Sequence, residues 1–414
     1  MGATTVTVPL IYYENGPIVG SAFIIFGGVL SFFSAYLIAF CCEFTGGSRY
    51  EDIAKELYGR PGLVFTSCCN ILCNIGFLVT YIVLFKNLMP YTINLLLEGP
   101  EKDKSKSLPD WIGYTKEGKM MWAFMFSYIC VFPLSLPRKL TALRFTSFMS
   151  FGISMFIVGT IFALSFSETA ETCATDCYDF KDRWDFSVSQ PKVSIHGIFS
   201  SLPLIIFAFM YQPNTPAIYT ELKVRNLTNI KKVLGAGTTL ASFCYILVGM
   251  FGYATFAKRD DIDKIMDNNM ILKNDYHGSF VIKICLFGML LVTLFACPFC
   301  VLPVKDSIEE ITCEKGETLS KTKNIIWTFV LVSISVTVAS VVTTISDAMT
   351  ILGATTNSGI GFLLPIHFYF KTQKDNKKLT NMKIMCYLIY VTICASSVIT
   401  MYTFIDTKLQ SNKS

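Results

Sequence analysis

The sequence predicts an all-α polytopic membrane protein that forms a single transmembrane domain over residues 1–414. Hydrophobic residues make up 52% of the 414 residues, charged residues only 16%, and the mean hydropathy is +0.50. Ten apolar stretches reach the roughly 20 residues that a helix needs to cross the hydrocarbon core. This composition excludes a soluble enzyme.

The predicted spans follow one another with short polar connections. They lie near residues 18–42, 62–85, 119–136, 144–167, 195–217, 234–257, 279–304, 323–346, 348–370 and 382–405. An incomplete span at residues 2–14 is too short to cross unaided. It lacks the basic front region and cleavage site of a signal peptide. We interpret it as the second half of a broken first helix, truncated at its N-terminus, whose first half lies upstream of Met1.

The fifth complete span is interrupted. Its sequence, SLPLIIFAFMYQPNTPAIYTELK at residues 201–223, carries two prolines after the apolar run. A helix broken inside hydrocarbon leaves backbone N–H and C=O groups unsatisfied, which is tolerated only where they line a cavity or meet a ligand. The break therefore indicates a membrane transporter.

The basic residues favour one orientation. If residues 2–14 run outward, the loops at 43–61, 137–144, 221–233, 305–323 and 371–383 face the cytosol. Basic clusters then lie directly against cytosolic span ends, as in PRK at 137–139 and KDNKK at 374–378. The basic residues are spread over short loops, which does not favour a nucleic-acid partner. In this topology the sequon at Asn226 is cytosolic and unmodified.

The cysteines do not predict a metal site. Most fall inside spans, where cysteine usually behaves as a small hydrophobe. Cys297 and Cys300 have CxxC spacing but no second pair and no nearby histidine. Cys173 and Cys177 lie in a polar outward loop and could form a disulfide in an oxidising compartment. No phosphate loop, HExxH or GxSxG motif supports an enzyme.

Ionisable residues within the spans are few. Lys86 lies near an outward span end, so we expect its stem to snorkel to the interface. Glu14 is the only carboxylate beside the interrupted segments. It is either a solvated helix cap or a site for a coupled proton.

Several motifs resemble the amino acid/auxin permease family, most closely its sodium-coupled neutral amino acid transporters. They are GATTVTVP at 2–9 with Gly16, CNIG at 73–76, PLSLPRK at 133–139, PLIIFAF at 203–209 with QPNTPAIYTEL at 212–222, FGYATF at 251–256 and PFCVLPVK at 298–305. The resemblance extends from residue 2 to about residue 370.

The resemblance implies a five-plus-five inverted repeat with an eleventh helix, and a substrate held between the broken first and sixth helices. Half-helix N-termini suit an amino acid carboxylate, and free carbonyls suit its ammonium group. The candidate contacts are Ala3, Thr4, Thr5, Val6, Thr7, Phe207, Ala208, Phe209, Met210 and Tyr211. Each side chain has the alternative of packing within its own helix. Asn74 either contacts the substrate or braces the broken helix.

Ion coupling stays open at this point. The resemblance implies a hydroxyl for sodium on the eighth helix, and Thr293 fits with a shift of one residue, because Leu294 and Ala296 occupy the expected positions. Sodium symport, proton symport and uniport are the alternatives. No other cofactor is expected.

The leading hypothesis is a secondary amino acid transporter that works by alternating access, with neutral substrates favoured. The competing hypothesis is an amino-acid-binding membrane sensor or accessory subunit, motivated by the missing half-helix. A truncated gene model is the third. The sequence allows the plasma membrane and a lysosomal or vacuolar membrane, and it does not define an oligomeric state.

Overall fold

The computed structural model describes residues 2–97, 109–137, 143–166, 195–256, 280–312, 319–374 and 380–411. All regular secondary structure in these ranges is helical, and eight of the described helices are long and apolar enough to cross a membrane. The protein is therefore an all-α, multi-pass integral membrane protein. Cys173 and Cys177 lie outside the described residues.

The elements alternate long helices with short π or 3₁₀ segments. They are η1 (Gly2–Val6), α1 (Val8–Thr45), α2 (Tyr50–Leu97), α3 (Lys116–Met125), η2 (Phe126–Val131), α4 (Phe132–Leu134), α5 (Leu143–Ser165), α7 (Ile195–Ala208), η5 (Gln212–Asn214), α8 (Thr215–Glu221), α9 (Leu227–Phe256), α11 (Phe280–Thr312), α12 (Lys321–Val341), α13 (Ile345–Leu352), η7 (Gly353–Asn357), η8 (Gly359–Leu363), α14 (Leu364–Thr372) and α15 (Asn381–Ser411). The segment expected at 119–136 lies on α3, η2 and α4, and that at 195–217 lies on α7, η5 and α8.

Helix α1 is two helices joined at a sharp bend. Gly16 has φ 76° and ψ 168°, a conformation that a residue with a Cβ rarely adopts, and Pro17 follows it. The bend separates the half-helix that starts at Val8 from the long helix that ends at Thr45. It falls between the two segments that the sequence indicates at 2–14 and 18–42.

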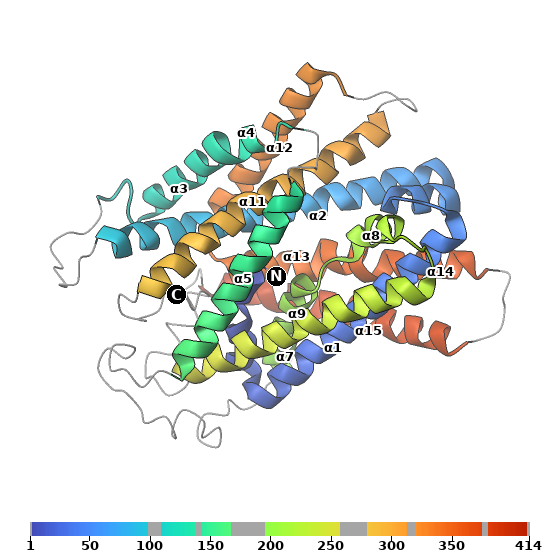
Figure 1. Ribbon diagram of the computed structural model, residues 1–414, viewed down its shortest axis with the longest axis horizontal. Coiled ribbons are helices and arrows are strands. Elements are labelled where there is room, and N and C mark those ends of the chain that lie inside the picture. Colours follow the sequence, from blue (N-terminus) through green and yellow to red (C-terminus); the bar gives the residue numbers. More distant parts are fainter. Residues whose placement is uncertain are drawn as a thin grey trace.

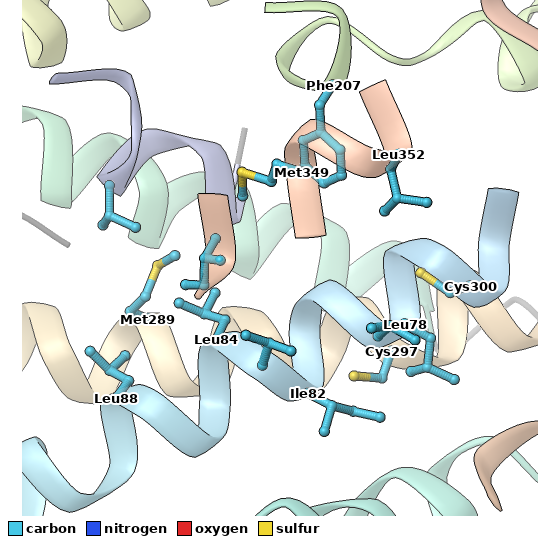
Figure 2. Packing of buried hydrophobic residues seen from close by; sticks show 14 of the residues in the cluster. Leu78, Ile82, Leu84, Leu88, Phe207, Met289, Cys297, Cys300, Met349 and Leu352 are labelled. Carbon is cyan, nitrogen blue, oxygen red and sulfur yellow. The ribbon is translucent and has the colours of Figure 1, made fainter. Parts of the chain in front are cut away.

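The helices pair across large distances in the sequence. Helix α2 packs along α11, and α1 packs along α9 (Figure 1). Helix α5 contacts both α11 and α9, and α13 contacts α2 and α7. Figure 2 shows part of the core, where Leu78, Ile82 and Leu84 of α2 face side chains of α11 and α13. The same buried cluster extends to residues of α1 and α9, such as Ile24 and Val248, and thus connects the two pairs.

Two prolines free backbone carbonyls, and hydroxyl groups of other helices bind them. A proline at position i removes the hydrogen bond to the carbonyl of residue i−4. The carbonyl of Phe199, four residues before Pro203, accepts from Thr400 Oγ1 at 2.9 Å. The carbonyl of Gly361, four residues before Pro365, accepts from Ser34 Oγ. The two carbonyls that the prolines leave without a helical partner are therefore hydrogen-bonded.

Two buried lysines bind helix ends. Lys86 of α2, only 4% exposed, donates to the carbonyls of Ala339 (2.5 Å) and Val342 (2.6 Å) at the C-terminal end of α12. Lys305 of α11 donates to the carbonyl of Ser135 at 2.6 Å, just after α4. The expectation that Lys86 snorkels is wrong, because the unpaired carbonyls at the end of α12 offer its ammonium group a closer partner than the interface.

Replacing Lys86 by Met should lower the free energy of unfolding by about 1–3 kcal/mol, since two buried carbonyls lose their donor. Thermal unfolding of the detergent-purified protein measures this. Lys323→Met is the matched control, because Lys323 is exposed. Equal melting temperatures for the two variants would show that the contacts of Lys86 carry no net stability.

Candidate functional site

The backbone is not helical at residues 209–211, between α7 and η5. The amide of Phe209 donates to the carbonyl of Ile205 (3.2 Å) and that of Met210 to Phe207 (3.3 Å), and then the helical pattern ends. The amide of Tyr211 donates to the side-chain Oε1 of Gln212 at 2.9 Å. Among the described residues, no hydrogen-bond donor meets the carbonyls of Phe209 and Met210. These carbonyls can accept from a ligand.

Tyr245 of α9 supports this break. Its hydroxyl donates to the carbonyl of Ala208 at 3.0 Å, and it also interacts with the side chain of Thr4. The ring of Tyr245 lies against Phe209, with 5.3 Å between the ring centroids. A single side chain therefore connects η1 with the end of α7.

Segment η1, which includes Ala3, is short and enclosed. Thr4, Thr5, Val6 and Thr7 are all buried. The hydroxyl of Thr7, between η1 and α1, donates to the carbonyl of Thr4 at 3.0 Å. Thr5 Oγ1 is buried without a hydrogen-bond partner in the described part of the chain. It is the one hydroxyl of this segment with an unused hydrogen-bonding capacity.

A cavity of about 540 Å³ lies between α2, α8, η5 and α11. Its residues are Ser48, Arg49, Tyr50, Glu51, Asn70, Cys73, Asn74, Phe77, Tyr81, Met210, Pro213, Asn214, Pro216, Ala217, Thr220, Phe299, Cys300, Pro303 and Asp306. The charged members belong to one end, near the start of α2 and the last turns of α11. The other end, around Tyr81 and Met210, is apolar and aromatic and reaches the break between α7 and α8.

The cavity includes two of the predicted substrate contacts, Asn74 and Met210. The others are not in its lining. Phe207 packs against the cavity residue Phe77, with 5.0 Å between ring centroids. The hydroxyl of Tyr211 bonds the Thr238 hydroxyl at 2.7 Å. Figure 2 shows Phe207 next to Met349, on the opposite side of α2 from Cys297.

The two predicted ion-coupling residues have separate hydrogen-bond partners in the fold. Thr293 is fully buried in α11 and donates to the carbonyl of Met289 at 2.8 Å. Glu14 accepts from the hydroxyls of Ser200 and Ser201 of α7, the second at 3.0 Å. Glu14 therefore joins the end of the α1 half-helix to α7 and is not a simple solvated cap.

A polar network at the charged end of the cavity escaped the sequence analysis. Glu51 Oε1 accepts from Asn70 Nδ2 (2.8 Å) and from Ser307 Oγ (2.8 Å). Asn74 Nδ2 donates to Asn70 Oδ1 at 2.8 Å. The i, i+4 spacing of Asn70 and Asn74 puts both amides on one helix face, and this spacing could have indicated the network. Nothing in the sequence placed Glu51, which precedes a bend at Gly59, against that face.

The π-helical segments η7 and η8 lie beside the break, because η7 contacts α7 and η8 contacts η5. A Cβ on Gly353 would lie 2.1 Å from the carbonyl oxygen of Pro203, so only glycine permits this approach. Asn357 Oδ1 accepts from the Cys73 thiol at 3.2 Å, and its Nδ2 is buried without a partner in the described residues. π-Bulges are frequent at functional sites.

A multi-pass helical protein whose broken helix meets one end of a cavity is built as a membrane transporter. The family model described as transmembrane amino acid transporter protein matches residues 1–407. The chain belongs to this family, which consists of amino acid transporters and not of enzymes. The family resemblance inferred from the motifs is confirmed.

Gly353→Ala should destabilise the protein by about 1–3 kcal/mol, because the added methyl group overlaps the Pro203 carbonyl and forces α7 and η7 apart. Gly359→Ala is the matched control, since a Cβ there meets no atom within 4 Å. Thermal unfolding and amino acid uptake are measured for both. Full stability and uptake in Gly353→Ala would show that the contact of η7 with α7 is loose.

Removing the hydroxyl of Tyr245 by Tyr245→Phe should reduce amino acid uptake about 5- to 100-fold, because the Ala208 carbonyl at the break loses its donor, a loss of roughly 1–3 kcal/mol. Tyr402→Phe, on an exposed tyrosine of α15, is the control. Uptake assays in proteoliposomes make the comparison. Unchanged uptake in Tyr245→Phe would mean that the break does not depend on this hydroxyl.

Proposed function

We propose that the protein is a secondary transporter that carries neutral amino acids by alternating access. The proposal depends on one observation. The broken segment between α7 and α8 reaches the apolar, aromatic end of the cavity around Tyr81 and Met210, which we call the inner end. Free carbonyls of Phe209 and Met210 suit the substrate ammonium group, and the N-terminal amides of short helices suit its carboxylate. The family of the chain supports amino acids as the substrate class.

The lining of the inner end supports neutral substrates. Phe77, Tyr81, Met210, Phe299 and Cys300 offer aromatic, thioether and thiol surfaces to a substrate side chain. The charged lining residues, Arg49, Glu51 and Asp306, all belong to the opposite end. A cationic or anionic side chain at the inner end would lose hydration without gaining a charged partner. Neutral side chains carry no such cost.

An alternating mechanism is supported by contacts between α1 and α7 on one side of the bundle and by the cavity on the other side. On the side that faces outward in the predicted topology, Glu14 and Asn15 of α1 contact Ser200 and Ser201 of α7. Asn15 Nδ2 lies 2.6 Å from Ser201 Oγ. The cavity opens where the chain leaves α1 and enters α2. In the predicted topology that end faces the cytosol, so the conformation is the inward-open state. Movement of α1, α7 and α9 against α2 and α11 would close it.

We also propose that the helices form a five-plus-five inverted repeat, with α15 as the eleventh helix. Broken segments open both halves, η1 with α1 in the first and α7 with α8 in the second. The two buried lysines support this. Lys86 on α2, the third helix of the first half, binds the end of α12. Lys305 on α11, the third helix of the second half, binds the end of α4. The two lysine contacts are therefore equivalent in the proposed repeat: each joins the third helix of one half to the end of the fourth helix of the other half.

Ion coupling is part of this proposal, with sodium and proton as the two candidates. Segment η1 contacts α11, which carries Thr293, and Thr5 Oγ1 in η1 has a free hydrogen-bonding capacity. These hydroxyls suit a sodium ion. Glu14 is the carboxylate that suits a proton. Uptake driven separately by an inward sodium gradient and by an inward proton gradient distinguishes the two.

The proposal predicts saturable uptake of neutral L-amino acids by proteoliposomes, with little uptake of lysine or glutamate. Met210→Trp should reduce this uptake at least about tenfold, because the larger ring fills the inner end of the cavity. Met385→Trp is the control, since Met385 of α15 is exposed. The readout is the initial rate of labelled amino acid uptake.

Two results would contradict the proposal. One is the absence of flux for every amino acid when the purified wild-type protein is folded. The other is equal uptake by the Met210→Trp and wild-type proteins. Saturable binding without flux would support the sensor hypothesis.

A further inference from the structure

The apolar part of the cavity lining differs in composition from the buried core. Its inner end carries the aromatic rings of Phe77, Tyr81 and Phe299, together with sulfur-containing side chains. Among the described residues, no leucine, isoleucine or valine lines the cavity. These three residue types make up most of the larger buried cluster of the same helices. The inner end therefore presents rings and sulfur atoms where the core presents branched aliphatic groups.

The rings and sulfur atoms come from three segments of the chain. Phe77 and Tyr81 are four residues apart on α2, so they lie on one helix face in consecutive turns. Phe299 and Cys300 belong to α11, which packs along α2. Met210 belongs to the break after α7. All five side chains line the same cavity, so the segments that bound it bring these groups together.

Phe299 is the ring that packs least with the protein itself. It is half-buried, it belongs to neither hydrophobic cluster, and no other aromatic ring of the described residues contacts it. Phe77, by contrast, packs on Phe207 with 5.0 Å between ring centroids. Tyr81 packs on the core, but its ring contacts no other ring in the described part of the chain. Phe299 and Tyr81 therefore have ring surface available to a ligand in the cavity.

Such a surface favours an aromatic ligand over an aliphatic one. Two aromatic rings in offset or edge-to-face contact gain more than their buried area provides, about 2- to 10-fold in binding for each pair. Thioether and thiol sulfur atoms also make favourable contacts with ring edges. An aliphatic side chain of the same size gains only from the burial of its apolar area.

We propose that the inner end of the cavity is a subsite for aromatic side chains, and that the protein prefers aromatic L-amino acids such as phenylalanine to aliphatic ones. This rests on the proposed transport of neutral amino acids through the same cavity. Phe299 is the main specificity-determining residue, because its ring has no aromatic partner in the described residues. Tyr81 supplies the second ring surface. The cavity of about 540 Å³ has room for a substrate of this size.

The experiment compares uptake of L-phenylalanine and L-cyclohexylalanine by proteoliposomes. The saturated ring of cyclohexylalanine has nearly the size of the phenyl ring but no π face, and it is the more apolar of the two. Burial of apolar area alone would therefore favour cyclohexylalanine. The wild-type protein is expected to show a kcat/KM for phenylalanine that is about 3- to 20-fold higher than for cyclohexylalanine.

Three variants locate the preference. Phe299→Leu keeps an apolar side chain but removes the ring, and should lower the ratio of the two kcat/KM values about 2- to 10-fold. Phe299→Tyr keeps the ring and should retain the preference for phenylalanine. Phe287→Leu is the matched control, because Phe287 lies on the same helix and is exposed. Its ratio should equal that of the wild-type protein.

Two results would overturn the inference. One is a wild-type kcat/KM for cyclohexylalanine that equals or exceeds that for phenylalanine. The other is a Phe299→Leu ratio equal to the wild-type ratio. The proposed function survives both results, since both substrates are neutral amino acids. Absence of flux for every amino acid overturns the proposed function instead. If Phe299→Leu does not fold, the wild-type ratio and Phe299→Tyr decide.

Discussion

The fold depends on one constraint, which is that hydrocarbon offers no partner to a backbone N–H or C=O group. An unbroken helix satisfies its backbone groups internally, but a broken helix needs hydrogen-bond donors from neighbouring helices. The hydroxyls of Thr400 and Ser34 donate to the carbonyls left unpaired by Pro203 and Pro365. The hydroxyl of Tyr245 donates to the carbonyl of Ala208. The carbonyls of Phe209 and Met210 meet no such donor among the described residues. Their position at the cavity end is the basis of the proposed substrate site.

The same constraint explains the two buried lysines. A helix end inside a packed bundle presents several carbonyls without intrahelical donors. Lys86 and Lys305 supply a cationic donor to such ends, and each reaches from α2 or α11 to the helix at its side. These contacts make α2, α4, α11 and α12 a connected frame. The helices α1, α7 and α9 lack lysine contacts of this kind in the described residues and are tied by smaller hydroxyl and amide groups.

The side chains that line the cavity differ between its two ends. The end at the break after α7 presents aromatic and sulfur-containing side chains, among them Phe77, Tyr81 and Met210. The other end presents Arg49, Glu51 and Asp306, where a carboxylate is tolerated while water has access. The polarity of the lining therefore changes along the cavity.

The sequence by itself determined the all-helical membrane class, the family, the bend near Gly16 and the break after Phe209, because hydropathy, proline and glycine act locally. Met210 was predicted through the family resemblance and Asn74 as a buried amide, and both line the cavity. Only the tertiary structure decided that Lys86 is buried, that Glu14 bonds Ser201, and that Glu51 meets Asn70 and Ser307. Each of these contacts joins residues from separate helices, and the packing of those helices follows from the whole set of buried side chains and not from any single segment.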